Sequence, residues 1–131
     1  MIGLDTNVVV RYIMQDDTRQ SPLATRIVES LSAESPGFVP LVAIVELGWV
    51  LTSAYELNGG QLVDAFEALL RTKELVVERG DMVWKALRLF RPANGDFADC
   101  LIACSAEAAG CAKTMTFDRG AAKRTGMTPI A

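Results

Sequence analysis

The chain begins MIGLDTNVVVRYIM (residues 1–14), in which a strand-like run stops at an acidic residue and a second apolar run follows. Residues 1–4 predict the start of a β-strand, and residues 8–14 predict a helix, although the three β-branched valines also suit a strand. Asp5, Thr6 and Asn7 separate the two runs. A solvated turn would explain Asp5, and so would one corner of a cation site. The rest of the sequence bears on this choice.

Strand-like and helical runs continue to alternate to the end of the chain. Ser21, followed by Pro22, is the predicted N-cap of one helix, and Asp81 caps another helix that Pro92 ends. The predicted helices cover residues 21–31, 41–57, 61–72, 81–91, 96–110 and 118–124, and the predicted strands cover residues 1–4, 37–40, 74–78, 113–117 and 127–131.

Strands separated by helices predict an α/β fold, a three-layer α/β/α sandwich with a mainly parallel sheet. In such a fold the right-handed crossovers place ligands beyond the C-terminal ends of the strands. No repeat, low-complexity tract or linker rich in Pro, Gly or Ser interrupts the pattern. We therefore expect residues 1–131 to form a single domain.

The composition, with 50% hydrophobic and 22% charged residues, predicts a folded globular protein rather than a disordered one. The most apolar run, residues 41–51, is too short to cross a membrane and contains Glu46, while residues 1–10 lack the basic start of a signal peptide. We therefore expect a soluble cytoplasmic protein with no membrane contact. The three cysteines lack paired spacing, which argues against a disulfide framework or a zinc site and favours small apolar filler on a buried helix.

The sequence contains no histidine, and this excludes His-based general bases, Ser-His-Asp or Cys-His nucleophiles and His-ligated zinc. Enzymatic chemistry would therefore depend on carboxylates, hydroxyls, Lys or Arg, or a bound ion. The net charge of −3 gives no overall electrostatic attraction for nucleic acid. Contact with nucleic acid would need a local basic patch or a metal ion.

Several carboxylates stand where a parallel α/β fold places ligands. Asp5 ends the first predicted strand and Asp118 follows the strand that carries Thr116, so both are expected at the same sheet edge. An Asx turn or a helix cap would explain each of them equally well. Glu46 has apolar helical neighbours, and a buried carboxylate requires a partner or an ion. Arg11 is the alternative partner of Glu46, and we favour a functional role.

Asp96 and Asp99 are three residues apart in the sequence GDFADCLIAC (residues 95–104). Asp96 follows a glycine and is the predicted N-cap of the helix, whereas Asp99 lies one turn inside it, ahead of an apolar run. We therefore assign Asp96 mainly to the cap, with a further role as an auxiliary metal ligand, and Asp99 to the chemistry.

Four carboxylates, Asp5, Glu46, Asp99 and Asp118, are thus expected at one edge of a cleft. Like charges held together need a counter-charge, and an all-oxygen ligand set suits Mg²⁺ or Mn²⁺. Such an ion can acidify a water molecule and stabilise negative charge on a phosphodiester during in-line attack. Given the fold, Asp5 is better explained as a metal ligand than as a turn residue.

The order and spacing of these motifs resemble those of the PIN-domain nucleases, and most closely the VapC-type toxins of bacterial toxin–antitoxin pairs. The matching features are LDTNVVVRYI (residues 4–13), the Glu within an apolar helix, DFADCLIA (residues 96–103) and TFD (residues 116–118). The resemblance covers essentially the whole chain. It implies a parallel sheet of five strands and a Mg²⁺- or Mn²⁺-dependent endoribonuclease.

The same resemblance implies roles for individual residues and for partners. The family ligands correspond to Asp5, Glu46, Asp99 and Asp118, and Asp96 occupies a position that is often acidic. Polar residues that support such ligands correspond to Thr6, Asn7 and Thr116. Relatives commonly form homodimers and are inhibited by a small antitoxin, which also binds operator DNA within the complex.

Basic residues provide candidate phosphate contacts at two places, Lys85, Arg88 and Arg91 on one predicted helix and Lys113, Arg119, Lys123 and Arg124 near the C-terminus. A solvated helix face explains these residues equally well, and we prefer that interpretation for Lys85 and Arg88. Arg119 is the predicted RNA contact because it adjoins Asp118.

Two other functions are compatible with parts of the pattern. A phosphatase of the haloacid-dehalogenase type would use Asp5 as nucleophile, but it would need a second Asp at the position that Asn7 occupies. A non-catalytic module could instead bind a basic peptide in an acidic cleft. Such a module would tolerate conversion of its acids to amides, whereas a nuclease would not.

Overall fold

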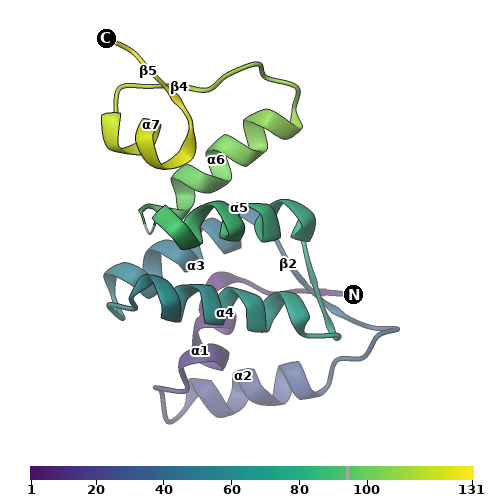
Figure 1. Ribbon diagram of the computed structural model, residues 1–131. Helices are drawn as coiled ribbons and strands as arrows, with labels where there is room; N and C mark the ends of the chain where they lie inside the picture. The colour runs from purple at the N-terminus through teal and green to yellow at the C-terminus, as the bar shows by residue number, and fades with distance from the viewer. Residues whose placement is uncertain (94) are drawn as a thin grey trace. The chain divides into compact units, whose positions relative to one another are not determined.

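Strands alternate with helices throughout the computed structural model, which describes residues 1–93 and 95–131 (Figure 1). The chain divides into two compact units, residues 1–80 and residues 81–131, called here the first and the second unit. Each unit contains parallel strands and helices, and each is described by itself.

The first unit is built on a three-stranded parallel sheet in the order β1-β2-β3, comprising β1 (Ile2–Gly3), β2 (Gly37–Val39) and β3 (Leu75–Val77). The register pairs Ile2 with Gly37 and Gly37 with Leu75. A Cβ atom on Gly37 would lie 2.8 Å from Leu31 Cδ1 and 3.0 Å from Leu4 Cδ1. Leucine side chains therefore pack closely against the central strand at this glycine, and a larger residue would require them to shift.

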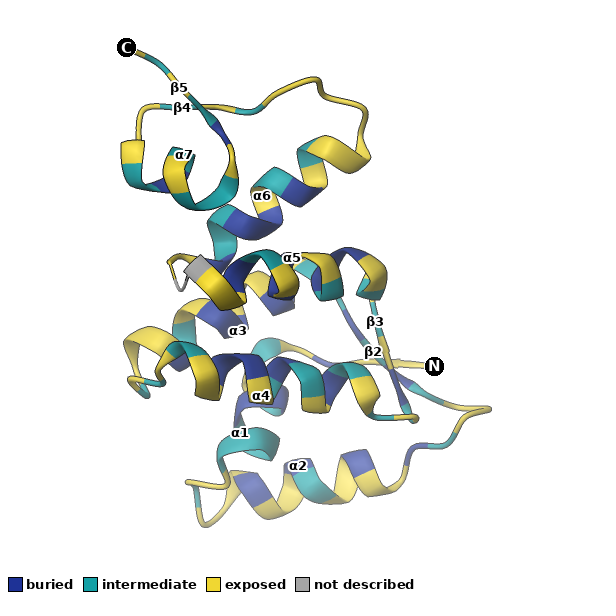
Figure 2. Ribbon diagram, in the orientation of Figure 1, coloured by how far each residue is buried: buried dark blue, intermediate teal, exposed yellow. Residues whose placement is uncertain are grey.

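Four helices complete the first unit: α1 (Thr6–Met14), α2 (Gln20–Glu29), α3 (Leu41–Ser53) and α4 (Gly59–Arg71). α1 contacts both α2 and α3, and α4 contacts β3. Buried and exposed residues alternate along α4, as its helical pattern of apolar residues requires (Figure 2). Its buried face includes Leu62, Phe66 and Leu69.

The start of α2 differs in its capping from what the sequence suggests. Ser21 was expected to be an N-cap, but α2 already begins at Gln20, and Ser21 lies buried inside the helix. The capping carboxylate is that of Asp17, whose Oδ1 accepts hydrogen bonds from the backbone N–H groups of Arg19 at 2.9 Å and Gln20 at 2.6 Å. An acid earlier in the chain thus satisfies the open donors, and the Ser21 prediction is wrong.

The second unit contains α5 (Gly80–Ala93), which begins at the last residue of the first unit, α6 (Phe97–Ala108), β4 (Met115–Thr116), α7 (Arg119–Thr125) and β5 (Thr128–Pro129). β4 and β5 are parallel, with Met115 paired with Thr128. The rings of Phe90 and Phe97 pack edge to face with their centroids 5.8 Å apart. This contact joins the end of α5 to the start of α6.

The start of α5 also corrects the sequence-based boundaries. Asp81 lies in the first turn rather than before the helix, and Pro92 lies within the last turn rather than ending the helix before it. An acid in the first turn still interacts favourably with the helix dipole. Cys100 and Cys104 are buried in α6, as expected of small apolar filler, and desolvation raises the pKa of Cys100 to about 11. Cys111 lies beyond α6 and is exposed, so the expectation is wrong for this cysteine.

The expected α/β class with parallel strand pairing is confirmed. The strands at the five expected places are present as a three-stranded sheet in the first unit and a two-stranded sheet in the second. None of the helices among the described residues has the length and apolar character needed to cross a membrane.

Candidate active site

Asp5 connects β1 to α1 and is the N-cap of that helix. Its Oδ1 accepts a hydrogen bond of 3.1 Å from the backbone N–H of Val8. Leu4, which follows β1, is buried, whereas Asp5 is exposed. The carboxylate of Asp5 is therefore accessible to solvent. The cap uses one carboxylate oxygen, and a carboxylate offers two acceptor oxygens.

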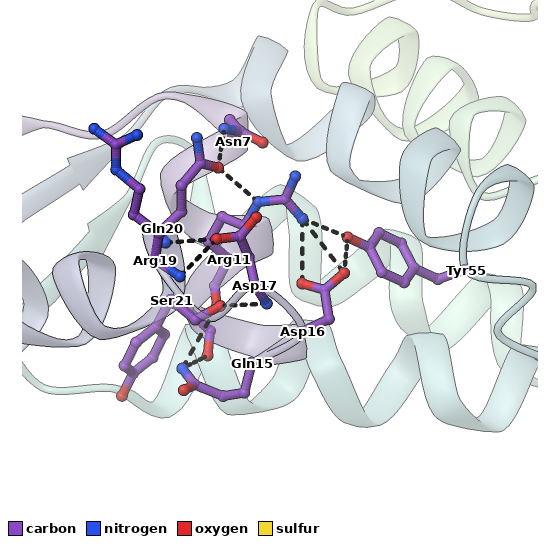
Figure 3. A network of polar contacts seen from close by, with 10 residues as sticks. Asn7, Arg11, Gln15, Asp16, Asp17, Arg19, Gln20, Ser21 and Tyr55 are labelled. Atoms are coloured by element: carbon purple, nitrogen blue, oxygen red, sulfur yellow. Dashed lines mark hydrogen bonds and ion pairs between the residues drawn. The ribbon is translucent and has the colours of Figure 1, made fainter.

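Asn7 belongs to a network of polar side chains within the first unit (Figure 3). Its Nδ2 lies 3.4 Å from Gln20 Oε1, which also accepts a hydrogen bond of 2.8 Å from Arg11 Nε. Arg11 in turn reaches Asp16 Oδ1 at 3.2 Å and donates to the Tyr55 hydroxyl at 2.9 Å. The network therefore connects a predicted site residue to the loop after α1 and to the end of α3.

The Tyr55 hydroxyl donates a hydrogen bond of 2.7 Å to Asp16 Oδ2. This hydrogen bond is the main reason that the pKa of Asp16 is lowered, and Arg11 adds to the effect. The same bond raises the pKa of Tyr55, with desolvation as a second cause. Arg11 is therefore engaged by Asp16 and Tyr55 rather than by Glu46, so the alternative pairing of Arg11 with Glu46 is wrong.

Glu46 lies in the middle of α3 and is exposed. Its expected burial is wrong, because the helix buries another face, formed by Ala43, Ile44, Leu47, Gly48 and Leu51. Two apolar helical neighbours of Glu46 are exposed as well, with Val42 75% and Trp49 69% accessible. An apolar sequence around an acid thus marks an exposed apolar helix face here, and the carboxylate is accessible for binding.

Asp96 and Asp99 have the positions in α6 that the sequence predicts. Asp96 is the N-cap, and its Oδ1 accepts from the backbone N–H of Ala98 at 2.7 Å and of Asp99 at 3.3 Å. Asp99 lies in the first turn and is half-buried. Desolvation raises the pKa of Asp99, the charges of Asp96 and Asp118 raise it further, and the charge of Arg124 opposes them.

Asp118 caps α7, with its Oδ1 accepting a hydrogen bond of 3.0 Å from the backbone N–H of Ala121. The backbone N–H of Asp118 donates to Thr116 Oγ1, also at 3.0 Å, so Thr116 holds the chain at the point where β4 gives way to α7. Arg119 is the first residue of α7 and is exposed. Thr6, the remaining predicted supporting residue, is the first residue of α1 and is half-buried.

Capping and metal ligation are compatible at Asp5, Asp96 and Asp118. In all three, the hydrogen bonds of the cap go to Oδ1. Within residues 1–93 and 95–131, no protein hydrogen bond reaches Oδ2 of these acids, so this oxygen remains available to a cation. These acids therefore act as helix caps, as one interpretation of the sequence expects, and this role does not exclude metal ligation.

The structure brings Asp96, Asp99 and Asp118 near enough to interact electrostatically in the second unit, while Asp5 and Glu46 belong to the first. Among the described residues, no three acidic or cysteine side chains are gathered closely enough to hold a metal ion as they stand. The carboxylate oxygens of these acids are nevertheless the donor type that hard divalent cations prefer, and such an ion would supply a counter-charge.

One of the basic helix residues has a partner inside the protein. Lys85 Nζ lies 2.9 Å from Glu107 Oε1, and this hydrogen bond raises the pKa of Lys85. Both side chains are exposed, so solvent screens the ion pair and it adds little to stability. The interpretation of Lys85 as part of a solvated helix face agrees with this pairing.

The comparison with known proteins assigns the family. A profile of the PIN domain matches residues 2–126, a range that includes every predicted site residue. The chain belongs to the PIN-domain family. A VapC ribonuclease of Aquifex aeolicus (strain VF5) is 24% identical over 116 residues, which cover 88% of this chain and 86% of that protein.

Two polar residues of this PIN domain have positions that the sequence alone does not predict. Gln20, which links Asn7 to Arg11, comes from a different helix, and its spacing from Asn7 matches no short motif. Arg124 was noted only as one of several basic residues, although the structure places it close to the acids of the second unit. The sequence shows that Arg124 lies near the C-terminal end of a predicted helix, but it does not show which residues surround the side chain.

Proposed function

We propose that this PIN-domain protein is a Mg²⁺- or Mn²⁺-dependent endoribonuclease that hydrolyses RNA phosphodiester bonds. In this proposal Asp5, Glu46, Asp99 and Asp118 are the metal-binding and catalytic acids, and Asp96 caps α6 and serves as an auxiliary ligand. The observation that carries the proposal is the half-buried Asp99, on which the charges of Asp96 and Asp118 act, within the sequence range that matches the PIN domain. The similarity to a VapC ribonuclease supports RNA as the substrate.

The side chains around these acids have distinct tasks in the proposed reaction. Asp96 fixes the first turn of α6 and thereby the position of Asp99, whereas Thr116 fixes the backbone of Asp118. Asn7, held by Gln20, supplies an amide next to Asp5 for a water molecule or a phosphate oxygen. A divalent ion bound by the acids would supply a Lewis acid and lower the pKa of a bound water.

RNA would be held through its phosphates. Arg119 adjoins Asp118 and is exposed, so it can reach a phosphate beside the acids. The protein carries a net charge of −3, and affinity for RNA would therefore come from such local contacts together with the bound ion.

We further propose that the protein is the toxin of a toxin–antitoxin pair and forms a homodimer. The exposed face of α3, formed by Val42, Val45 and Trp49 and called here the α3 face, is the candidate dimer surface, because solvated apolar groups on one helix face favour association. A small antitoxin would inhibit the enzyme, and operator DNA would be bound only through the antitoxin complex. This assignment rests on the similarity to a VapC protein.

The direct test is an RNA cleavage assay with the purified protein in Mg²⁺, in Mn²⁺ and in EDTA. Cleavage that requires either metal is the expected result. Cleavage of equal rate in EDTA would contradict the metal dependence, and a lack of cleavage of every RNA tried in both metals would contradict the enzyme assignment. A phosphatase would instead release inorganic phosphate from small phosphomonoesters, which the same preparations can be assayed for.

A further inference from the structure

Two glycines of the second unit border the space that the Arg124 side chain fills. A Cβ atom built on Gly95 would overlap Nε and Cδ of Arg124 and would lie 3.0 Å from its Cζ. A Cβ atom on Gly120 would lie 2.9 Å from Arg124 Nη1. Neither glycine has a positive φ, so the backbone conformation does not explain them. Their missing side chains leave the room that the guanidinium takes.

The same space adjoins the acids of the second unit. The point that a Cβ atom on Gly120 would occupy lies 3.2 Å from Asp118 Oδ1, in addition to its closeness to Arg124 Nη1. Gly95 immediately precedes Asp96, and the charge of Arg124 acts on Asp99. The guanidinium therefore lies near Asp99 and Asp118, and it borders the glycine that precedes Asp96.

Arg124 approaches these acids without closing a tight ion pair. In the part of the chain that the structure describes, no carboxylate oxygen lies within 4.0 Å of its guanidinium nitrogens. Its side chain is half-buried. It therefore compensates the negative charge of the acids at a short distance. Its long, flexible side chain can still adopt another conformation away from them.

We propose that Arg124 is a built-in counter-cation of the acidic cluster, which compensates Asp96, Asp99 and Asp118 in the metal-free protein and competes with a divalent cation for them. The proposal rests on the metal site described under the proposed function and adds what sets the affinity of that site. A cation that enters the cluster meets the like charge of Arg124 and has to displace the guanidinium from between Gly95 and Gly120. Arg124 thus sets the metal concentration at which the protein becomes loaded.

The test is the dissociation constant of Mn²⁺, measured by isothermal titration calorimetry on the full chain without RNA. Arg124→Leu should bind Mn²⁺ more tightly, on the order of tenfold, because a unit charge a few ångströms from the ion is removed. In EDTA the same variant should melt at a lower temperature than the wild type, since the acids lose their compensation. Lys123→Leu is the matched control, because Lys123 is exposed, adjacent in α7, and carries the same charge. It should change the dissociation constant less than twofold.

A second variant displaces Arg124 without removing it. Gly95→Ala places a methyl group where Nε and Cδ of Arg124 lie, and the flexible side chain can move aside at little cost. Mn²⁺ affinity should rise in the same direction as in Arg124→Leu. In the Arg124→Leu background, Gly95→Ala should have no further effect, so the two changes should be non-additive. If Arg124→Leu does not fold, the Mn²⁺ affinity of Gly95→Ala alone tests whether Arg124 competes with the metal.

Three outcomes would overturn the proposal. Unchanged Mn²⁺ affinity in Arg124→Leu relative to Lys123→Leu would show that Arg124 only fills space. Weaker Mn²⁺ binding in Arg124→Leu would show that the guanidinium organises the acids for the metal instead of competing with it. Lack of Mn²⁺ binding by the wild type and every variant would remove the proposed metal site itself, and this inference with it.

Discussion

At the scale of single residues, the acids of this protein combine a structural with a proposed chemical task. Asp5, Asp96 and Asp118 each cap a helix through Oδ1, whereas Asp99 has a raised pKa in a half-buried position. A cap can be replaced by another capping side chain, but a carboxylate ligand cannot. Substitutions can therefore separate the two tasks.

We expect Asp96→Ser to retain much of the RNA cleavage and to change the free energy of unfolding by less than about 0.5 kcal/mol, because Ser caps as well as Asp. Asp99→Asn should lower cleavage by roughly a hundredfold or more, a loss typical of a removed electrostatic catalytic group. It should be at least as stable as the wild type, since it relieves the repulsion by Asp96 and Asp118. Cleavage kinetics and urea unfolding measure both effects. The opposite ranking of the two variants would show that the roles of the acids are exchanged.

A second residue-scale prediction concerns Asp16 and Tyr55. A lowered pKa in the folded state means that Asp16 stabilises the fold fully above its unfolded pKa of about 3.9, and that this contribution is lost as the pH falls through the lower folded value. Tyr55→Phe removes the hydrogen bond that is the main cause of the shift. The wild type should therefore be more stable than Tyr55→Phe near pH 6, with a smaller difference near pH 2.5. Urea unfolding at both pH values measures this, and a difference independent of pH would refute it.

At the scale of elements, α3 is where sequence and structure differ most. The sequence shows that residues 41–51 are apolar apart from Glu46 and Gly48, but it cannot show which side of the helix faces the core. The structure buries Ile44, Leu47 and Leu51 and exposes Glu46 together with the α3 face. An almost uniformly apolar helix carries too weak a periodic signal to identify its buried face.

Other elements were predictable because local chemistry determines them. The N-caps Asp96 and Asp118 and the end of α6 near Gly110 follow from short-range rules. The cap of α2 did not follow from these rules. Asp17 precedes the helical pattern and Ser21 begins it, and only the packing of the helix selects between them as the capping residue. Arg124 between two glycines, and Gln20 beside Asn7, depend on how separate helices meet, which no local pattern encodes.

The first α3 prediction concerns Glu46 as a proposed metal ligand. Glu46→Gln should keep the fold, because the side chain is exposed and nearly isosteric, and should lower RNA cleavage about a hundredfold or more. Glu78→Gln is not a suitable control because Glu78 accepts a hydrogen bond from the backbone of Leu41. Glu29→Gln, at the exposed end of α2, should leave cleavage unchanged. Full activity of Glu46→Gln in excess metal would remove Glu46 from the ligand set.

The second α3 prediction concerns the α3 face as a dimer surface. Trp49→Ser should weaken the homodimer by about 2 kcal/mol or more, roughly thirtyfold in the dissociation constant, because large aromatic side chains dominate protein interfaces. Ile27→Ser on α2 is the control, since Ile27 is also exposed but lies outside the α3 face. Light scattering over a concentration series measures the change. A wild type that is monomeric at high micromolar concentration, or a Trp49→Ser variant that dimerises as well as the wild type, would refute the prediction.

At the scale of the whole molecule, the PIN-domain match extends through both units, from residue 2 to residue 126. The proposed acids come from both of them, with Asp5 and Glu46 in the first unit and Asp99 and Asp118 in the second. The response of the protein to metal should depend on each proposed ligand, so a single carboxylate can be tested. Asp5 is the best choice, because Asn replaces Asp as an N-cap with little loss.

The most direct test is therefore thermal melting of the wild type, Asp5→Asn and Asp64→Asn in EDTA and in Mn²⁺. Asp64 is an exposed acid on α4 and controls for the loss of one charge. In EDTA, Asp5→Asn should melt no lower than the wild type. In Mn²⁺ at about a hundred times the dissociation constant, the wild type and Asp64→Asn should each gain about 2.7 kcal/mol of stability, and Asp5→Asn should gain much less. An Asp5→Asn variant that is destabilised in EDTA yet gains as much from Mn²⁺ as the wild type would show that Asp5 only braces the start of α1.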